Sequence, residues 1–323
     1  MENTLRVILP RDWHDPLGTD SRERRAMLDF QRRFVRIRKG ALDIFDSVQY
    51  RKLETNASRP STGSYQYELD DARADLITAM IASMVDEILL EGGRQEFWFN
   101  DVYVKPAYVQ GTALTYSNLA AQSVAYAVSK PTFEALIASP PYRRRIALIA
   151  GRQFEQMQGF ASDVAKDKLA GVLVRGMIAG KNPAAIAHDI VERTDVDYKR
   201  ALRIARTEIN QALRTARADE AKDAQDRLGL RTKIMHISAL SPTTRDEHAD
   251  RHGRLFEIQE EMDWLATDAN SINCKCSMVE VLLRKNGQPY DTDLLVRAAR
   301  MREEWAARQA AKAEEKAASK KAR

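Results

Sequence analysis

The sequence predicts a mainly α-helical fold with a small β element toward its C-terminal end. Long segments carry apolar residues at helical spacing, and only two short runs read as strands. Hydrophobic residues make up 44% of the chain, enough for a core, and the 30% of charged residues suit long solvated helices. We therefore expect an α+β protein with an N-terminal helical domain (1–145), a C-terminal α+β domain (146–285) and a charged helical or disordered tail (286–323).

Amphipathic helices are expected to build the N-terminal domain. Phe30, Phe34 and Ile37 lie on one apolar stripe, which predicts a helix from about residue 20 to residue 50. The same spacing predicts further helices over three segments: 68–91, 111–128 and 142–164. Between two of them lies an aromatic cluster, which we expect to pack in the core, although a partner-binding surface is the alternative: Phe97, Trp98, Phe99, Tyr103 and Tyr108.

Capping signals organise the helices of the predicted C-terminal domain. Asn182 is suited to cap a short helix whose first residue is Pro183. Asp195 or Asp197 is then expected to cap a second, longer helix, which Gly229 ends. The domain is expected to fold as a self-contained unit.

Two strand-like runs follow, over residues 233–237 and 278–283. A last helix is expected from about residue 292. Its end is rich in Ala, Lys, Glu and Arg and offers few apolar residues for burial. Residues after Ala306 are therefore expected to be dispensable for folding.

Polar residues of chemical interest concentrate between residues 201 and 283, where both Cys and three of the five His lie. They form three phrases in a fixed order: Ile-Ala-Arg-Thr-Glu on a helix, Arg-x-x-His followed by a Gly, and Asn-Cys-Lys-Cys. The residues that we single out as the structural motif are Arg206, Thr207, Glu208, Arg245, His248, Gly253, Asn273, Cys274 and Cys276.

This ordered set resembles the Mu F-like minor head proteins of tailed phages, also called phage head morphogenesis proteins. The resemblance covers roughly residues 165–283. The chain departs from the family pattern at Lys275, where Arg is usual. A Trp expected near the strand before the Arg-x-x-His phrase is also absent, and His236 lies close to that place.

The resemblance implies a minor capsid protein that acts in procapsid assembly and takes part in DNA packaging and DNA ejection. It implies that the portal protein and the capsid proteins are its partners. It places the protein in the virion, in the head interior, after a stage in the host cytoplasm. It implies no catalytic residue and no cofactor.

The residues themselves suggest one metal site. His248, His252, Cys274 and Cys276 supply the imidazole and thiolate ligands that zinc prefers. The two His, four residues apart, would share a face of a helix, and the two Cys would share a face of a strand. The alternative is that the Cys are small buried apolar residues. A bridge between Cys one residue apart would be strained.

A second alternative is a nucleic-acid-acting, nuclease-like enzyme centred on Arg245 and His248. Arg206, Glu208 and Asp246 would complete its phosphate-binding and acid–base groups. The sequence contains no Gly-rich phosphate loop, Ser nucleophile elbow or Asp-x-Asp metal pair. We therefore favour a structural role, in which arginines and carboxylates of the long helix hold the loop that carries Arg245 and His248.

The net charge of +5 permits contact with nucleic acid without demanding it, because 46 acidic residues accompany 51 basic ones. No window has the length and apolarity of a membrane span. Basic residues of the tail are candidates for non-specific contact with double-stranded DNA: Arg308, Lys312, Lys316, Lys320, Lys321 and Arg323.

Overall fold

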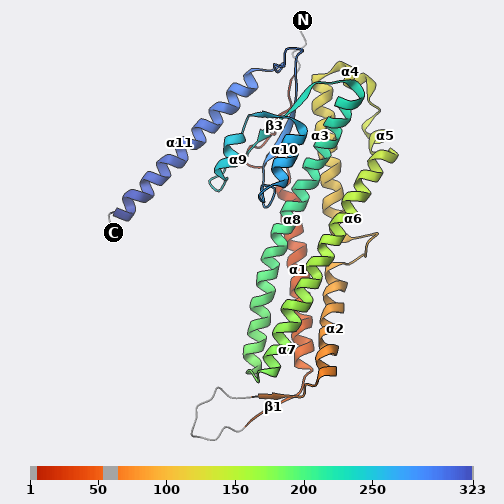
Figure 1. Cartoon of the computed structure of the whole chain (residues 1–323), viewed down its shortest axis with the longest axis vertical. Coiled ribbons are helices and arrows are strands. Elements are labelled where there is room, and N and C mark those ends of the chain that lie inside the picture. Colours follow the sequence, from red (N-terminus) through yellow and green to blue (C-terminus); the bar gives the residue numbers. More distant parts are fainter. Residues whose placement is uncertain (1–5, 54–64, 322–323) are drawn as a thin grey trace. The chain divides into compact units, whose positions relative to one another are not determined.

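The computed structural model describes residues 6–53 and 65–321, which are mainly α-helical (Figure 1). Its strands form a two-stranded sheet, β1-β2, and a three-stranded sheet in the order β4-β3-β5, both antiparallel. The predicted fold class, mainly α with a small sheet, is therefore confirmed.

The residues group into two compact units, and each unit draws on separate stretches of the chain. One unit contains the described residues before Arg22, residues 104–146 and those from Arg206 onward. The other contains residues 22–103 and 147–205. This interleaving contrasts with the consecutive segments expected from the sequence. A cut at residue 145 would separate α3 (Lys105–Gln122) from the strand β5 (Ser277–Leu282), against which it packs.

The unit of residues 22–103 and 147–205 is built mostly from helices, with one small sheet. Phe30, Phe34 and Ile37 are buried on its first helix, as their spacing predicts. The aromatic run from Phe97 to Phe99 and Tyr103 are buried too, so these side chains serve the core. The elements are β1 (Tyr50–Lys52), β2 (Tyr65–Tyr67), α2 (Asp71–Leu89), the π-helical η2 (Asp163–Ala170) and α7 (Gly171–Ile178). The unit also contains α1 (Asp20–Asp46) from Arg22 onward, the π-helical η1 (Asn100–Val104) up to Tyr103, and parts of α6 (Pro140–Ser162) and α8 (Pro183–Leu228).

Helix α8 is one continuous element, where the sequence predicted two helices. The Asn182 side chain accepts a hydrogen bond from the Ala184 N–H, as expected of a helix cap. Asp197, however, is no cap, because it lies buried inside the helix within 3.4 Å of Arg193 and 3.3 Å of Lys168. The Asp197 carboxylate is paired with cations, which allows it to be buried within the helix. It therefore does not cap the start of a new helix.

The other unit packs the three-stranded sheet between helices. It contains α3, α4 (Val124–Ser129), α5 (Phe133–Ala138), the remainder of α6 and α8, β3 (Thr232–Ile237), α9 (Asp246–Arg251), β4 (Leu255–Phe256), α10 (Ile258–Ala266), β5 and α11 (Asp293–Lys321). Strands β3 and β5 pair in the register that places Ile234 opposite Glu280 and His236 opposite Met278.

Alternation along the strands gives the sheet two different faces. On one face Ile234 and Met278 pack with Ala218 and Ala221 of α8. On the other face the side chains pack with Leu294 of α11 and with the N-terminal segment that contains Trp13: Met235, Ile237, Val279 and Val281. His236 and Glu280 therefore stand on the face that meets α8.

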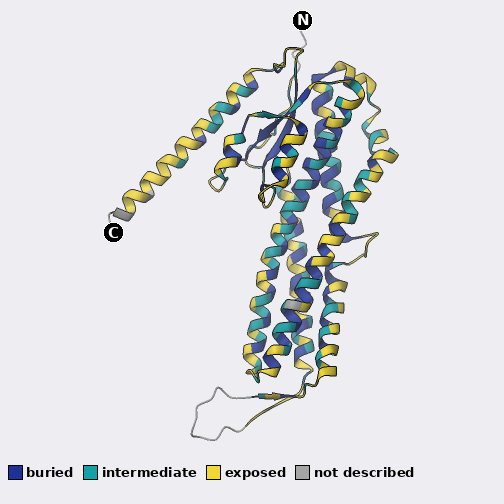
Figure 2. Ribbon diagram, in the orientation of Figure 1, coloured by how far each residue is buried: buried dark blue, intermediate teal, exposed yellow. Residues whose placement is uncertain are grey.

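Only the first turns of α11 belong to the core. Leu294 and Ala298 are buried, and the Trp305 indole N–H donates to the Ser241 carbonyl oxygen at 3.0 Å. Beyond Trp305 the helix continues, and its described side chains are almost all exposed (Figure 2). The charged tail therefore begins as packed helix and carries no apolar stripe past that point.

Removal of residues 307–323 is expected to change the free energy of unfolding by less than about 0.5 kcal/mol, because the deleted surface buries little. The matched variant Trp305→Ala should cost about 3 kcal/mol, since it deletes a buried ring and orphans the Ser241 carbonyl. Urea unfolding of the two variants measures both values. A loss above about 1 kcal/mol on truncation would show that the far end of α11 packs on the fold.

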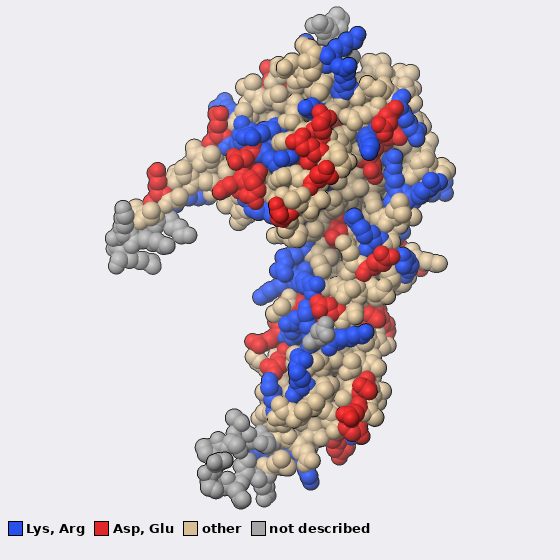
Figure 3. Space-filling view, viewed as in Figure 1, with Lys and Arg blue, Asp and Glu red and all other residues tan. Residues whose placement is uncertain are grey.

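Acidic and basic side chains lie interspersed on the face of the molecule drawn in Figure 3. Such mixing is expected from 46 acidic and 51 basic residues. Among the described residues, no helix has both the length and the apolarity that a membrane crossing requires.

Candidate functional site

Residues of all three sequence phrases lie together beside α8, and Asn273 is held there by two α8 side chains. The Arg206 guanidinium donates to the Asn273 side-chain oxygen at 2.7 Å, and the Asn273 N–H donates to the Thr207 hydroxyl at 3.0 Å. Asn273 has a φ of 54°, a left-handed conformation that Asn tolerates better than most residues. Glu208 lies half-buried on the same helix.

Arg214 holds the Cys-x-Cys backbone, and no sequence motif pointed to it. Its Nε donates to the Cys276 carbonyl oxygen at 2.8 Å and its Nη2 to the Cys274 carbonyl oxygen at 2.7 Å. The Asn210 amide donates to the Cys274 oxygen at 3.0 Å. Arg206, Asn210 and Arg214 are spaced by four residues, so they share one helix face. That spacing is the signal that could have found Arg214.

Arg245 holds the backbone of the loop between α10 and β5 in the same way. It donates to the carbonyl oxygens of Asn270, at 2.7 Å, and Ala269, at 3.2 Å. Gly253 has a φ of 75°, and a Cβ there would lie 2.3 Å from the Ala298 Cβ of α11. The Arg and the Gly of the second phrase therefore have defined structural tasks.

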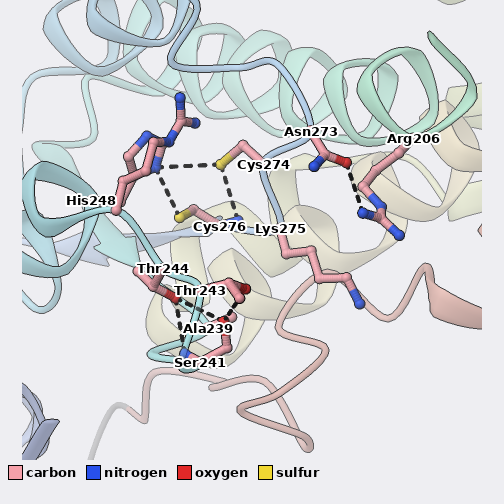
Figure 4. Close-up of a pocket in the computed structure, with 11 residues that line it drawn as sticks. Arg206, Ala239, Ser241, Thr243, Thr244, His248, Asn273, Cys274, Lys275 and Cys276 are labelled. Carbon is pink, nitrogen blue, oxygen red and sulfur yellow. Dashed lines mark hydrogen bonds between the residues drawn. The ribbon is translucent and has the colours of Figure 1, made fainter. Parts of the chain in front are cut away.

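A thiol–imidazole cluster lies under these loops (Figure 4). His248 of α9 is buried, and its Nδ1 lies 3.3 Å from the Cys276 Sγ and 3.5 Å from the Cys274 Sγ. The Cys276 N–H points to the Cys274 Sγ at 3.3 Å. The Trp264 ring covers His248, with 4.7 Å between ring centroids.

His236 joins this cluster, whereas His252 faces elsewhere. Ligand atoms of His236, His248 and Cys276 all lie within 4.8 Å of one another. His252 follows the last residue of α9, and its Nδ1 accepts the Ser238 N–H at 3.1 Å. Of the four residues that the sequence suggested for a metal, the structure brings three together, His248, Cys274 and Cys276. His236 takes the place that we expected of His252.

The His236 ring is oriented by a carboxylate. Its Nδ1 lies 2.6 Å from the Glu261 Oε1, and the other carboxylate oxygen accepts from the Arg251 Nη2 at 2.7 Å. Burial opposes the ionisation of Glu261, but the hydrogen bonds and charges of His236 and Arg251 outweigh it and lower its pKa. The carboxylate therefore holds the His236 ring through its Nδ1, and the buried Nε2 has no hydrogen-bond partner.

The pKa values of the two thiols are shifted in opposite directions. Hydrogen bonding from Cys276 holds the pKa of Cys274 well below its usual value against the effect of burial, and the Arg214 charge acts in the same direction. The same hydrogen bond, together with burial, raises the pKa of Cys276 well above its usual value. Burial lowers the pKa of His252 to about 4, so this ring is neutral at physiological pH.

A polar cavity of about 190 Å³ opens above the cluster. Arg206, Arg245 and Lys275 line it together with hydroxyl groups of Ser241, Thr243 and Thr244. The three cations already have partners: Arg206 on Asn273, Arg245 on two carbonyl oxygens, and Lys275 on the Asp20 carboxylate at 2.6 Å. Asp246, the first residue of α9, is exposed and does not line the cavity.

Of the tail residues suggested for DNA contact, Arg308 is exposed on α11 and Lys312 is exposed as well. The side chains of Lys316, Lys320 and Lys321, and the whole of Arg323, lie outside the described residues.

Comparison with known protein families gives a match for the segment that contains the three phrases. Residues 167–279 match the family described as phage Mu protein F like protein. The resemblance expected over residues 165–283 is therefore confirmed.

Two curated relatives share the similarity in part. An NAD(+)–arginine ADP-ribosyltransferase EFV of Enterococcus faecalis is 28% identical over 149 residues, which cover 42% of this chain and 30% of that protein. An uncharacterized protein of Haemophilus influenzae is 28% identical over 119 residues, 36% of this chain and 25% of that protein. The chain thus spans less than a third of the length of these relatives. No solved structure matches.

Proposed function

Because the chain carries the domain of the phage Mu protein F like family over residues 167–279, we propose that it is a minor head protein of a tailed phage. In this role it joins the procapsid in the host cytoplasm, associates with the portal protein and the capsid proteins, and remains in the head interior. It acts in assembly, in DNA packaging and in DNA ejection, and it does so without catalysing a reaction.

The observation that supports a structural role is that the arginines near the motif donate hydrogen bonds within the protein. Arg206, Arg214 and Arg245 all donate to oxygens of the loop between α10 and β5, which holds Asn273 and Cys274. Arg donors on backbone and amide oxygens fix the geometry of a loop. The three arginines thereby support a rigid module that an assembly can dock.

Contact with packaged DNA is part of the proposal and rests on the exposed charge of α11. Arg308 and Lys312 stand on a part of α11 whose described side chains are almost all exposed. Lys and Arg on such segments bind phosphates by counterion release without sequence choice. The variant that lacks residues 307–323 should therefore bind duplex DNA more weakly at low salt and with a smaller salt dependence.

The test of the function is incorporation into particles. Procapsids and mature heads are purified from producing cells, and mass spectrometry quantifies this chain relative to the portal protein. We expect it in both fractions at a fixed ratio to the portal. Its absence from procapsids and heads, in cells that contain the folded protein, would contradict the proposal.

The alternative, a nuclease-like enzyme centred on Arg245 and His248, makes an opposite prediction. We expect Arg245→Ala to lower stability and particle incorporation together, because it leaves two loop carbonyl oxygens without a donor. Hydrolysis of DNA by the wild-type protein, lost in a folded Arg245→Ala or His248→Ala variant, would favour the enzyme.

A further inference from the structure

We propose that Cys274, Cys276, His248 and His236 form a structural zinc site. The donor atoms are the two Sγ atoms, the His248 Nδ1 and the His236 Nε2. Two thiolates and two neutral imidazoles are a ligand set of structural zinc, and they neutralise its double charge, as a buried ion requires. Coordination releases the thiol protons to solvent. The inference rests on these four side chains and holds whether or not the protein enters phage heads.

The distances around His248 fit a tetrahedral zinc ion. Zinc bonds of about 2.3 Å to sulfur and about 2.05 Å to nitrogen place neighbouring N and S ligands about 3.5 Å apart. The His248 Nδ1 lies 3.3 Å from one sulfur and 3.5 Å from the other. The His248 Nδ1 of α9 therefore already stands at coordination spacing from both sulfurs of the segment before β5.

His236 offers the fourth donor. Its Nε2 is buried and has no hydrogen-bond partner, while its Nδ1 is held by Glu261. A metal-binding His ordinarily donates its second N–H to a carboxylate, which is the arrangement of His236, Glu261 and Arg251. A ring nitrogen of His236 lies within 4.8 Å of the ligand atoms of His248 and Cys276, and Cys274 is not part of that group. Closing the tetrahedron therefore requires the His236 and Cys274 side chains to move together toward the ion.

The backbone around the two sulfurs is also arranged for thiolates. The Cys276 N–H points to the Cys274 Sγ at 3.3 Å, a contact that stabilises negative charge on sulfur. Arg214 fixes both cysteine carbonyl oxygens and brings a positive charge next to the pair. The site would join β3, α9 and the start of β5 at one point, which gives the metal a structural task.

The first measurement is the zinc content of the full-length protein, purified under reducing conditions without added metal. We expect about one zinc ion per chain. Removal of the zinc with a strong chelator should lower the unfolding midpoint, and added zinc, but not magnesium, should restore it. Less than about 0.1 zinc per folded chain, in protein that also binds none when zinc is added, would overturn the site.

Two matched variants separate His236 from His252. In His236→Asn the amide can still donate to Glu261, but the Nε2 donor is gone, so zinc content should fall at least tenfold. In His252→Asn the amide oxygen can still accept the Ser238 N–H, and zinc content should remain that of the wild-type protein. Loss of zinc from the His252 variant alone would overturn the proposed ligand set.

If the His236 variant fails to fold, the ligand set can still be tested on the wild-type protein. Replacement of zinc by cobalt should give the intense visible absorption of a tetrahedral ion and a sulfur-to-cobalt charge-transfer band. An octahedral cobalt spectrum without sulfur bands would contradict the site. So would a native protein whose mass shows a bridge between Cys274 and Cys276, since bridged sulfurs cannot coordinate as thiolates.

Discussion

Glu280→Gln is expected to lower the free energy of unfolding by about 3–5 kcal/mol, the usual cost of breaking a buried ion pair on one side. Glu280 is fully buried on β5, and the Arg217 guanidinium meets both of its oxygens, at 2.9 and 2.8 Å. Thr115 and Asn118 of α3 donate to the same carboxylate, at 2.7 and 2.8 Å. The variant would leave Arg217, itself 3% exposed, as an uncompensated buried charge.

The matched control is Glu304→Gln on α11. Glu304 pairs with Arg300 at 3.0 Å, but the two side chains are 50% and 80% exposed, so the change should cost less than about 0.5 kcal/mol. Urea unfolding at pH 7 compares the two variants. If Glu280→Gln lowered the free energy of unfolding no more than the control, the buried hydrogen bonds of Glu280 would not stabilise the fold.

The double variant Arg217→Met with Glu280→Leu adds a second check. It removes both charges together, so it should be less destabilised than the sum of the two single changes.

The pH dependence of stability has a defined direction. Burial opposes ionisation of Glu280, but Arg217 and the hydrogen bonds from Asn118 and Thr115 hold its pKa below the ordinary 4.5. Its contribution is therefore complete above pH 4.5 and is lost as the pH falls through the lower, folded-state pKa. Wild-type stability should fall in that acid range, and the Glu280→Gln variant should show a flatter curve.

The helices and the two longer strands were predictable because their signals are local. Phe30, Phe34 and Ile37 repeat at helical spacing and lie on one buried face of α1. The run around Val279 has the composition of a strand and forms β5. In each case neighbouring residues alone decide which face is apolar.

Buried charge was not predictable in this way, because its partners are remote in the sequence. Glu280 sits between two valines, and its partner Arg217 lies 63 residues away in the sequence. Asp197 reads as a helix cap for the same reason. Only the three-dimensional packing supplies the cations that allow these carboxylates to be buried.

The expectation that His248 and His252 share a helix face is wrong, because of where α9 ends. His248 and His252 are four residues apart, but α9 ends at Arg251, so the two rings never share a helix face. The pairing of β3 with β5 places His236 opposite Met278. Met278 is only two residues after Cys276, so this pairing brings His236 close to the cysteines. Strand register is a property of the pair, and neither strand carries it alone.

A fragment of residues 146–323 is expected not to fold by itself, although the sequence suggested a self-contained domain after residue 145. The fragment lacks α3, the helix that packs against β5 and forms hydrogen bonds with it. The Gln122 amide donates to the Glu280 carbonyl oxygen at 2.9 Å, and its oxygen accepts the Leu282 N–H at 2.9 Å. Without α3, β5 would lose these backbone partners, and the Glu280 carboxylate would lose two donors.

Packing adds to this loss. Gly111 of α3 approaches α8 so closely that a Cβ there would lie 2.3 Å from the Leu213 carbonyl oxygen. The N-terminal segment also covers the sheet, through Leu9 and Trp13. These contacts bury apolar surface that the fragment would expose to water, at a cost that a marginally stable domain cannot offset.

Three samples test this expectation by amide chemical-shift dispersion and by urea unfolding. Residues 146–323 alone should show neither dispersed signals nor a cooperative transition. Residues 1–306 should show both, because the deleted end of α11 has no packing task. Co-expression of residues 1–145 with residues 146–323 should recover a folded complex, since the missing helix returns in trans. A cooperative transition of residues 146–323 alone, at the midpoint of the full chain, would instead establish consecutive domains, and α3 would then be an accessory to a fold that is complete without it.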